Sequence, residues 1–361
     1  MPRQRMAVIG VGALGRHHAR ILSQIEGVEL VAVVDSRADQ GRDVAGKCGT
    51  NWLADYQELL SHGAVDAVSV VVPTVAHWQV AGDFLRAGIP VLVEKPLAAN
   101  VDQARELVRL AADNGALLQV GHIERFNPAF QVASQQIDKP KYIRAERTSP
   151  YTFRSTDIGV VHDLMIHDIE LTQSLVQSEF VSVEAFGVSL VGGHEDAVQA
   201  RVRFANGCIA DLSANRVCPA ATRTIQVWSA AGCVTADLHA RTLTSFTAGP
   251  DLLAGQLPYE LGREKGADIN QLKSEMFTRF IQVDSPTIEA ADALTLELRS
   301  FLDCIRTHTP PLVDGVAGLQ AVKLAEAILK SVSDHRWDGQ AAGAHGPGTL
   351  ISQYGGQRSA A

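Results

Sequence analysis

Three glycines near the amino end of the chain have the spacing of a phosphate-binding turn. Gly10, Gly12 and Gly15 form a GxGxxG pattern between a strand-like run and a helix-like run. Gly10 would permit the tight turn, Gly12 would let backbone N–H groups approach a pyrophosphate, and Gly15 would let helix and strand pack closely. Alone, the pattern also fits an ordinary glycine-rich turn.

An aspartate stands where a dinucleotide-binding domain needs an acid. Asp35 ends the second strand-like run, 20 residues after Gly15, where it would accept hydrogen bonds from ribose hydroxyls. The alternative is that Asp35 only caps the next helix. A carboxylate here repels a 2′-phosphate, so we expect NAD, although Arg37 lies close enough to weaken that preference. The predicted cofactor contacts of this region are Gly10, Gly12, Ala13, Leu14, Gly15, Asp35 and Ser36.

A lysine follows a later strand of the same region. Lys95, within Glu94-Lys95-Pro96, stands at the carboxyl end of a strand, and open α/β sheets bind ligands at that edge. Its ammonium could hydrogen-bond a reacting oxygen and stabilise the negative charge of a developing alkoxide. The alternative is a surface lysine without a catalytic role.

A histidine and an aspartate with helical spacing are the second catalytic candidates. Imidazole titrates at about pH 6.5, so His167 could take a hydroxyl proton as a general base. Asp163 stands four residues earlier, on the same helical face, and could orient the ring. The alternative is that Asp163, His167, Glu170 and Ser174 form an ordinary solvated stripe opposite an apolar band.

Two further polar residues follow the last strand of this region. His122 and Arg125 could contact substrate or cofactor, or they could belong to a structural hinge. His17 and His18 are expected to serve packing or to lie on the surface. No group of His, Cys or acidic residues has metal-ligand spacing, so no metal is predicted.

The first third of the chain alternates strand and helix patterns. Short apolar runs at 6–9, 28–34, 67–72, 90–93 and 117–120 are separated by helical patterns at about 13–25, 37–47, 74–87 and 101–114. Runs that are apolar on both sides suit parallel strands covered on both faces. The alternation predicts a Rossmann-type, doubly wound parallel sheet in an α/β fold.

The pattern changes after about residue 122. Helices are predicted at 127–136 and 161–178, followed by strands at 180–190, 197–204, 208–214, 222–229, 232–238 and 241–247. This order predicts an α+β domain with an open, mostly antiparallel sheet. Residues 249–275 read as a long loop, either a lid or an oligomer contact, and helices follow near 290–307 and 316–334. The predicted domains are 1–122 for NAD, 123–337 for substrate and oligomerisation, and a flexible tail at 338–361.

Composition narrows the class of protein. The chain has 361 residues, a net charge of −8, 46% hydrophobic residues and 20% charged residues, which describes an ordinary globular protein without a reason to bind nucleic acid or anionic membranes. No apolar run approaches the ~20 residues of a membrane span. Five scattered cysteines without a CxxC pair suit reduced thiols. We therefore expect a cytoplasmic protein.

Three motifs together resemble the glucose–fructose oxidoreductase/inositol dehydrogenase family. Residues 72–77 (VPTVAH) look like its TPxxxH, with Val72 where Thr is common; residues 94–96 match its EKP, and residues 163–168 look like its DxxxHD. The likeness covers residues 5–335. It implies an NAD-dependent dehydrogenase, a last helix packed on the first domain, dimers or tetramers formed through the open sheet, and a cis Lys95–Pro96 peptide. It also implies cofactor contacts from Pro73, Thr74, His77, Glu94, Lys95 and His122.

Residues 121–128 (GHIERFNP) and 157–171 (DIGVVHDLMIHDIEL) resemble one branch of this family, the UDP-N-acetylglucosamine 3-dehydrogenases. That branch oxidises the 3-hydroxyl of the sugar, usually for a partner aminotransferase in lipid A synthesis; His162 and Glu170 depart from its pattern. Arg154, with Tyr151 nearby, is a candidate for the nucleotide phosphates. Two alternatives stay open: a dehydrogenase of a free polyol or sugar such as myo-inositol or glucose, and a non-catalytic NAD-binding regulator. The predicted substrate contacts are Lys95, Arg125, Tyr151, Arg154, Asp163 and His167.

Overall fold

The computed structural model describes residues 3–60, 65–153, 158–191, 193–338, 340–341 and 343–346. The chain forms two compact units. The first contains residues 1–126 and 291–327, and the second contains residues 127–290 and 328–361. None of the helices within the described ranges is long and apolar enough to cross a membrane.

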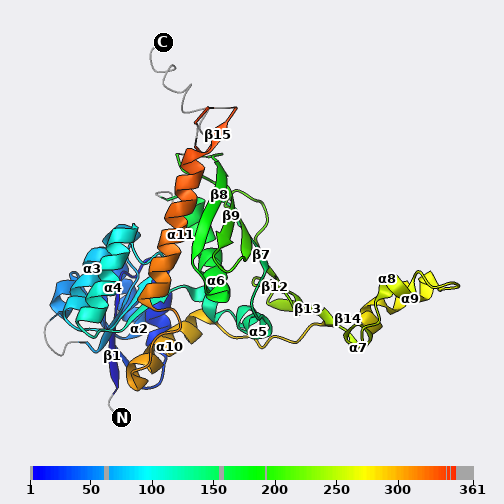
Figure 1. The fold of residues 1–361 in the computed structure, drawn as a ribbon. Helices are drawn as coiled ribbons and strands as arrows, with labels where there is room; N and C mark the ends of the chain where they lie inside the picture. The colour runs from blue at the N-terminus through cyan, green and yellow to red at the C-terminus, as the bar shows by residue number, and fades with distance from the viewer. Residues whose placement is uncertain are drawn as a thin grey trace. The chain divides into compact units, whose positions relative to one another are not determined.

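A six-stranded parallel sheet forms the centre of the first unit (Figure 1). Its order is β3-β2-β1-β4-β5-β6, so the strand order reverses between β1 and β4, where sheets of this kind bind ligands. The predicted doubly wound sheet is therefore confirmed. The edge strand β3 was not predicted, because it has only three residues. The strands are β1 (Gln4–Ile9), β2 (Val28–Val34), β3 (Asn51–Leu53), β4 (Ala67–Val70), β5 (Val91–Glu94) and β6 (Leu118–Gly121).

Helices cover both faces of this sheet and bury its apolar side chains. Along β1, Ala7 and Ile9 pack into one core with Phe84 of α3 and Leu107 of α4. The alternate residues Met6 and Val8 pack into a second core with Leu22 of α1, as the period-two geometry of a strand requires. The helices here are α1 (Gly15–Leu22), α2 (Ala38–Cys48), α3 (Thr74–Arg86) and α4 (Val101–Asp113), with short 3₁₀ turns η1 (Tyr56–Leu59) and η2 (Ile123–Phe126).

Two helices from the end of the chain also belong to the first unit. Phe301 of α10 (Ala293–Thr307) packs into the core with α1, and Leu319 of α11 (Gly315–Asp334) packs into the core with α3. Gly318 lets α11 approach β6 closely, because a Cβ there would lie 2.6 Å from the Val120 side chain. The observed division therefore differs from the predicted boundaries 1–122 and 123–337, since residues 291–327 supply apolar cover for the first sheet.

The second unit contains an eight-stranded sheet of order β14-β13-β12-β11-β7-β10-β9-β8 (Figure 1). Among the described strands, β7 and β10 form a parallel pair and the other pairs are antiparallel, which confirms a mostly antiparallel sheet. The central strand β7 was missed, because its charged residues Arg144, Glu146 and Arg147 hide the alternation. The strands are β7 (Tyr142–Thr148), β8 (Phe180–Val188), β9 (Ala197–Phe204), β10 (Ile209–Asn215), β11 (Thr222–Ser229), β12 (Gly232–Asp237), β13 (Thr242–Ala248) and β14 (Ile281–Asp284).

The strands of this sheet bury one face and expose the other. In β9, Val198 and Val202 are buried, whereas the intervening Gln199 and Arg201 are exposed. Helices α5 and α6 contact the sheet at β12 and β13 and at β7 and β10, respectively. The helices of this region are α5 (Pro128–Gln136), the π-helical turn η3 (Val161–Met165) and α6 (Ile166–Val176).

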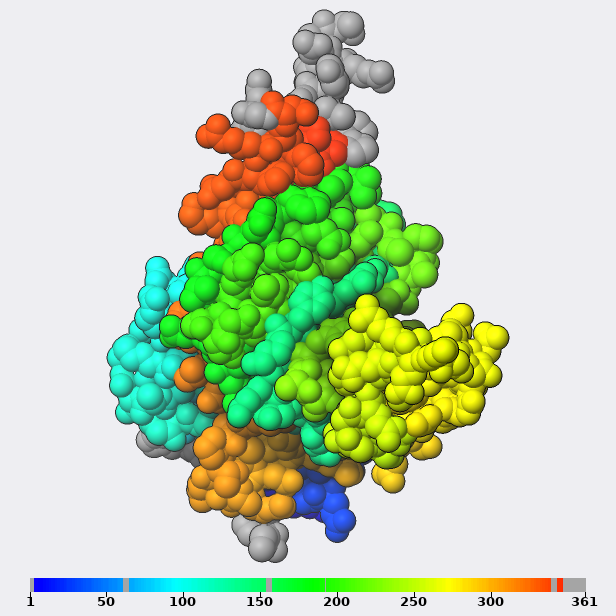
Figure 2. Space-filling view, turned by 45° about the vertical axis from the view of Figure 1, so that its right-hand side comes forward, coloured from blue at the N-terminus to red at the C-terminus, as the bar shows by residue number. Residues whose placement is uncertain are grey.

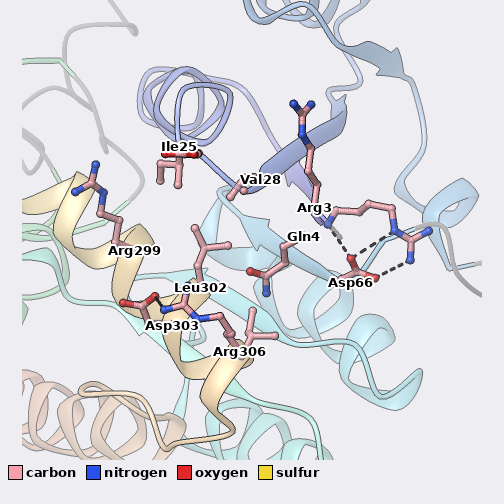
Figure 3. Close-up of a pocket in the computed structure, with 13 residues that line it drawn as sticks. Arg3, Gln4, Ile25, Val28, Asp66, Arg299, Leu302, Asp303 and Arg306 are labelled. Carbon is pink, nitrogen blue, oxygen red and sulfur yellow. Dashed lines mark hydrogen bonds and ion pairs between the residues drawn. The ribbon is translucent and has the colours of Figure 1, made fainter. Parts of the chain in front are cut away.

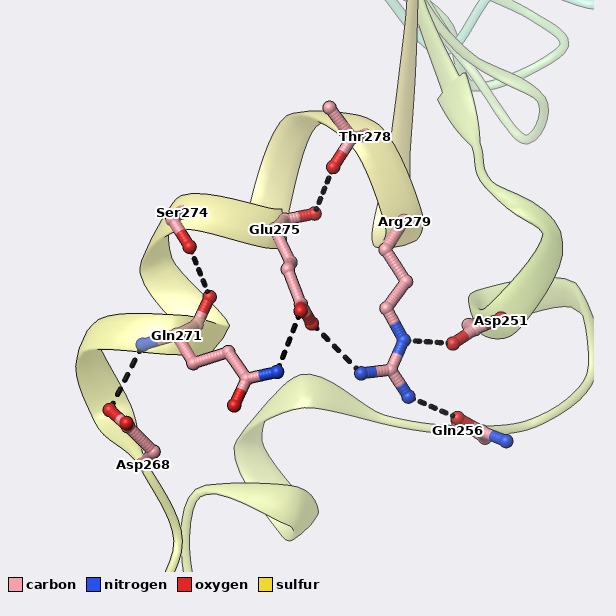
Figure 4. Close-up of polar contacts among 8 residues, drawn as sticks. All are labelled: Asp251, Gln256, Asp268, Gln271, Ser274, Glu275, Thr278 and Arg279. Carbon is pink, nitrogen blue, oxygen red and sulfur yellow. Dashed lines mark hydrogen bonds and ion pairs between the residues drawn. The ribbon is translucent and has the colours of Figure 1, made fainter.

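Residues 249–280, called the arm below, connect β13 to β14. The prediction of a plain loop for 249–275 was wrong, because the arm contains α7 (Pro250–Leu253), α8 (Pro258–Leu261), α9 (Ile269–Glu275) and the π-helical turn η4 (Met276–Phe280). Helices of four to seven residues are marginal alone, and α7, α8 and α9 bury none of their described residues. A polar network holds the arm together, in which Arg279 binds Asp251, Glu275 and Gln256 (Figure 4).

Part of the predicted flexible tail is ordered against the second unit. Strands β15 (Arg336–Trp337) and β16 (Gln340–Ala341) form a hairpin. Trp337 donates from its indole to the Gly343 carbonyl oxygen at 2.9 Å, and the backbone of His345 pairs with β8. These contacts include residues of the predicted tail, whose flexibility stays a prediction, and residues 339, 342 and 347–361 lie outside the described residues.

Candidate active site

A cavity of about 610 Å³ opens at the carboxyl ends of β1, β2 and β4 in the first unit. This edge includes the point where the strand order reverses. The lining includes five residues that the sequence predicted for the cofactor, namely Gly10, Gly12, Asp35, Ser36 and Pro73. The predicted Ala13 and Leu14 are exposed just before α1, and Thr74 begins α3.

The three glycines of the loop meet different surroundings. Gly10 has a φ of +86°, and a Cβ there would lie 2.6 Å from the Val71 carbonyl oxygen. At Gly15, a Cβ would clash with the carbonyl oxygen of Gly10. At Gly12, by contrast, the nearest atom to a Cβ would be the Gln40 side-chain nitrogen at 3.9 Å. The outer two positions therefore serve close packing, and the middle one leaves space for a ligand.

Asp35 connects β2 to the glycine loop. One carboxylate oxygen accepts from the Val11 N–H at 3.1 Å and from the Gln40 side chain at 3.0 Å, and the other accepts from the Arg37 N–H at 2.9 Å. The helix-cap alternative is wrong, because Arg37 is the N-cap residue of α2. The acid thus lines the cavity where a ribose would bind, and the open space at Gly12 also fits a dinucleotide.

Glu94 is a buried anchor at the end of β5. Its carboxylate accepts from the Lys95 N–H at 3.2 Å and lies 3.2 Å from His18 Nε2, an ion-pair distance without good hydrogen-bond alignment. The other ring nitrogen of His18 lies 2.9 Å from the Ser69 hydroxyl. Gly121 leaves room for this carboxylate, since a Cβ there would lie 2.8 Å from it. Glu94 therefore fixes the backbone of Lys95 from the buried side of the strand, and its own carboxylate is not exposed to contact a cofactor directly.

His18 was wrongly grouped with His17 as a packing or surface residue. Its side chain is fully buried, whereas His17 is exposed. The available signal was its place on the apolar face of α1, three residues after Gly15. A histidine inside a buried helix face needs polar partners, and here these are Ser69 and Glu94.

His77 joins two of the motifs. Its ring nitrogens lie 2.8 Å from the Pro96 carbonyl oxygen and 3.0 Å from the Val72 carbonyl oxygen, and burial lowers its pKa. A neutral imidazole carries one N–H, so it donates to one of these carbonyls at a time. This geometry favours a positioning role over the predicted direct contact. The adjoining Lys95–Pro96 peptide is cis, as the resemblance implied.

His122 lies at the end of β6, beside the strand that carries Lys95. Burial lowers its pKa to about 3, and the charges of Lys95 and Arg125 add to this effect, so the ring is neutral. Within the described chain, neither ring nitrogen has a hydrogen-bond partner. A buried polar group without a partner is unfavourable, which fits a position that a bound ligand or water would complete.

Asp163 and His167 lie in the second unit, on η3 and α6. Both are half-buried. The solvated-stripe alternative is contradicted at Glu170, which is 2% exposed, and the other three members of the stripe are half-buried instead of fully solvated. A π-helical turn around Asp163 is a feature that often marks functional sites.

Two buried acids that the sequence analysis missed hold this helix. Asp168 accepts two hydrogen bonds of 2.9 Å from the Arg147 guanidinium of β7, and both side chains are buried. Glu195 accepts from the Val161 N–H at 3.3 Å, and burial raises its pKa. A side chain at Gly159 would overlap with this carboxylate. These partners are 21 and 34 residues away in sequence, so no local pattern shows them.

The remaining predicted substrate residues are placed as follows. Tyr151 lies under the Arg216 guanidinium at 5.6 Å, and Arg216 forms a buried ion pair of 2.8 Å with Asp196. Arg154 lies outside the described residues. Arg125 belongs to η2 of the first unit and is half-buried. Within the part of the chain that the structure describes, no three His, Cys, Asp or Glu side chains cluster for a metal ion.

Two family models match the chain. The model described as oxidoreductase family, NAD-binding Rossmann fold, matches residues 4–122. The GFO/IDH/MocA C-terminal domain model matches residues 129–235. The two matches follow one another along the chain and each falls on a different unit.

Similar proteins agree with these matches. UDP-N-acetylglucosamine 3-dehydrogenase of Acidithiobacillus ferrooxidans is 34% identical over 334 residues, covering 92% of this chain and 98% of that protein. The NAD⁺-dependent scyllo-inositol 2-dehydrogenase of Bacillus subtilis is 27% identical, covering 86% of this chain and 89% of that protein.

Solved structures show the same architecture. The structure of the Acidithiobacillus ferrooxidans enzyme superposes with a TM-score of 0.80 at 32% identity, covering 92% of this chain and 98% of the other. Levoglucosan dehydrogenase in complex with NADH and levoglucosan shares the fold, with a TM-score of 0.74 at 17% identity, covering 91% and 97% of the two chains. The chain therefore belongs to the GFO/IDH/MocA oxidoreductase family, with an NAD-binding Rossmann fold as its first domain.

Proposed function

We propose that this protein oxidises the 3-hydroxyl of UDP-N-acetylglucosamine to the 3-keto nucleotide sugar with NAD⁺. The observation that carries the proposal is the 34% identity with a UDP-N-acetylglucosamine 3-dehydrogenase along 98% of that enzyme. The match covers 92% of this chain, so it extends over most of both units. We further propose a role in supplying the ketone to an aminotransferase of lipid A synthesis.

The proposed reaction assigns a separate role to each of the three catalytic candidates. The residues that line the cofactor cavity, among them Gly10, Gly12 and Asp35, would hold NAD⁺, and the bound cofactor would supply the hydride acceptor for C3 of the sugar. The Lys95 ammonium donates a hydrogen bond to the oxygen of that hydroxyl and stabilises its developing negative charge. His167 takes the hydroxyl proton as general base, and Asp163 orients the imidazole and stabilises its cationic form. Loss of the hydride and the proton leaves the C3 carbonyl.

The surroundings of Lys95 support its proposed role. The backbone N–H of Lys95 donates to the buried Glu94 carboxylate, which lies 3.2 Å from His18. These contacts fix the position of the Lys95 backbone, from which the side chain extends. His122 beside it is neutral, because burial and the charge of Lys95 both lower the pKa of the imidazole. A neutral neighbour does not add a second positive charge that would disfavour the ammonium.

The diphosphate is the proposed ligand of the segment before η3. The Tyr151 ring lies against the Arg216 guanidinium, which forms a buried ion pair with Asp196. This contact supports the position of Tyr151. Arg154, three residues later, would supply the guanidinium that matches phosphate oxygens.

A free polyol is the second candidate substrate. The observation that favours it is the set of inositol 2-dehydrogenases among the relatives, including the Bacillus subtilis enzyme at 27% identity. These relatives match over a similar share of the chain but at 27% and 25% identity against 34%, which favours the nucleotide sugar.

A substrate comparison tests the proposal. The enzyme is incubated with NAD⁺ and, separately, UDP-N-acetylglucosamine, myo-inositol or glucose, and NADH is followed by absorbance. We expect turnover of the nucleotide sugar and a keto product by mass spectrometry. Turnover of myo-inositol or glucose alone would contradict the proposal and support the second candidate.

A pair of lysine variants tests the catalytic assignment. Lys95→Met should lower kcat by about 10²–10⁴-fold, the usual contribution of a group acting on the transferred proton or its oxygen, with NADH binding retained. The exposed Lys47 of α2 pairs with Asp43, and Lys47→Met is the matched control with unchanged kcat. Equal kcat values for Lys95→Met and Lys47→Met would contradict a catalytic role for Lys95.

We also propose that the protein is a cytoplasmic homodimer or homotetramer. The arm supports this, because it exposes large apolar side chains that an isolated chain leaves in water: Leu253 is 76% and Phe277 is 59% exposed. In the space-filling view the arm, coloured yellow, lies on the visible surface (Figure 2). The open face of the second sheet also exposes Trp228. Light scattering on the purified protein tests this, and a monomer mass would contradict it.

A further inference from the structure

The largest cavity described in the first unit lies away from the cofactor edge. It measures about 1190 Å³ and is formed by the amino ends of β1 and β2 and by one face of α10 (Figure 3). The cofactor cavity opens at the carboxyl ends of the same strands and shares no lining residue with it. The six-residue strand β1 separates the two edges by roughly 20 Å.

Arginines dominate the polar part of this lining. The cavity gathers four of them, with three carboxylates from Glu26, Asp66 and Asp303. On α10, Arg299, Asp303 and Arg306 recur at helical spacing, which places them on one face of the helix. In a chain with a net charge of −8, four guanidinium groups against three carboxylates form a local positive region.

Some of these charges are already paired. Arg5 donates to Asp66 at 2.6 Å and lowers the pKa of that carboxyl, and Arg306 donates to Asp303 at 2.7 Å. Among the described residues, no carboxylate forms an ion pair with Arg3 or Arg299. Figure 3 shows these two arginines on either side of Ile25 and Val28. The unpaired guanidinium groups therefore border an apolar surface.

The apolar surface is continuous with the core of the domain. Leu302 is 6% exposed and packs into the same core as Phe301, and Ile25 and Val28 pack against that core. A small inorganic anion would leave this surface in contact with water. A ligand with an apolar or aromatic body would cover it, and the volume of about 1190 Å³ exceeds the roughly 300–1,000 Å³ of most small-molecule sites, so a ligand of nucleotide size fits.

We propose that this cavity binds an organic phosphate of nucleotide size. Guanidinium groups match phosphate oxygens with paired N–H donors, so Arg299, at one side of the apolar surface, binds the phosphate, while Ile25 and Val28 cover the base and Arg3 borders its far side. The site is distinct from the cofactor cavity, and the inference does not rest on the proposed dehydrogenase substrate.

A binding measurement on the full chain tests this. The protein is saturated with NADH, so that the cofactor site is filled, and is titrated calorimetrically with AMP, ribose 5-phosphate or inorganic phosphate at low salt. We expect one AMP per chain, with ribose 5-phosphate weaker and inorganic phosphate weaker still. Absence of AMP binding, or equal binding of inorganic phosphate, would overturn the proposal.

Two charge-reversal variants locate the site. Arg299→Glu should weaken AMP binding by about tenfold or more, as expected when a charged hydrogen bond is lost, and Arg3→Glu, across the apolar surface, should weaken it less. Both side chains are exposed, so the fold should persist. Arg105→Glu on α4, an exposed arginine paired with Asp102 outside the cavity, is the matched control. Equal AMP affinity of Arg299→Glu and the wild type would place the bound nucleotide elsewhere and overturn the proposal.

Discussion

Asp35 and His77 in the first unit bind backbone groups, whereas Asp168 and Asp196 in the second unit bind buried arginines. Asp35 accepts from the Val11 N–H, and His77 lies between two carbonyl oxygens. Asp168 and Asp196 each form an ion pair of 2.8–2.9 Å in which both side chains are at most 6% exposed. These two pairs of side chains are thus held by different means, backbone groups at the cofactor edge and guanidinium groups in the interior of the second unit.

The difference affects what a substitution should do. A backbone group that loses its side-chain partner at the rim of a cavity can bind water instead. A buried arginine that loses its carboxylate keeps an uncompensated charge away from water. Substitutions at the cofactor edge should therefore affect mainly binding, and substitutions in the buried pairs of the second unit should affect mainly stability.

The largest expected effect is the loss of the Asp196 carboxylate. Asp196 is fully buried and accepts from Arg216 at 2.8 Å and from the N–H groups of Leu190 and Val191 at 2.6 and 2.8 Å. Asp196→Ala leaves these donors without an acceptor, so we expect the free energy of unfolding to fall by about 3–5 kcal/mol. Urea denaturation followed by fluorescence measures it.

The matched control is an exposed pair in the same sheet. Asp211 accepts from Arg201 at 2.7 Å and from the Tyr142 hydroxyl at 2.8 Å, and the side chains of Arg201 and Asp211 are 52% and 27% exposed. Asp211→Ala should cost only about 0–1 kcal/mol, because solvent screens this pair. Equal losses for the two variants would contradict the idea that burial of the pair determines its effect.

The cofactor edge of the first unit was easier to predict from the sequence than the supports of the Asp163 and His167 helix in the second unit. Gly10, Gly12 and Gly15 are three local positions whose spacing follows from the geometry of one turn, and Asp35 ends the next strand of the same unit. Because these relations are local in sequence, the cofactor edge and the parallel sheet could both be predicted. The predicted roles of Lys95 and His167 stay predictions.

The next effect concerns the middle glycine of the loop. Gly12→Ala places a methyl group in the space left for the cofactor, with no neighbour closer than 3.9 Å. We expect unchanged stability and roughly tenfold to hundredfold weaker NADH binding, from the usual 1–3 kcal/mol of steric overpacking. Fluorescence titration with NADH measures the affinity.

Gly46→Ala is the control, because Gly46 lies at an exposed position of α2 and a Cβ there would meet no atom within 4 Å. This variant should bind NADH like the wild type. Wild-type affinity in Gly12→Ala would place the pyrophosphate elsewhere.

The supports of the second unit could not be predicted from the sequence. Arg147 lies on β7, a strand that the sequence pattern did not predict, and its partner Asp168 follows 21 residues later on a different element. Glu195 reaches the start of η3 across 34 residues. Such pairs become visible only when the sheet order is known, because β7 lies between β10 and β11 instead of beside its neighbours in sequence.

The smallest expected effect tests the buried His122 of the first unit through pH. Its pKa is lowered to about 3 by burial, with further lowering by Lys95 and Arg125, whereas an unfolded histidine titrates near 6.5. At mildly acidic pH, His122 therefore binds a proton in the unfolded chain but stays neutral in the folded chain. The contribution of His122 to the free energy of unfolding is fully present above about pH 6.5 and is lost as the pH falls toward about 3.

Between pH 7.5 and 5.5 this loss should be about 1.4 kcal/mol, from one pH unit below the unfolded pKa. His122→Gln, which cannot titrate, should lose correspondingly less stability over the same interval in urea denaturation. His239→Gln, at an exposed position, should keep the wild-type pH dependence, because that side chain is in water in both states. If His122→Gln follows the wild-type curve, the folded imidazole accepts its proton as readily as the unfolded one. A polar partner would then have to satisfy the ring inside the first unit, where the described chain offers none.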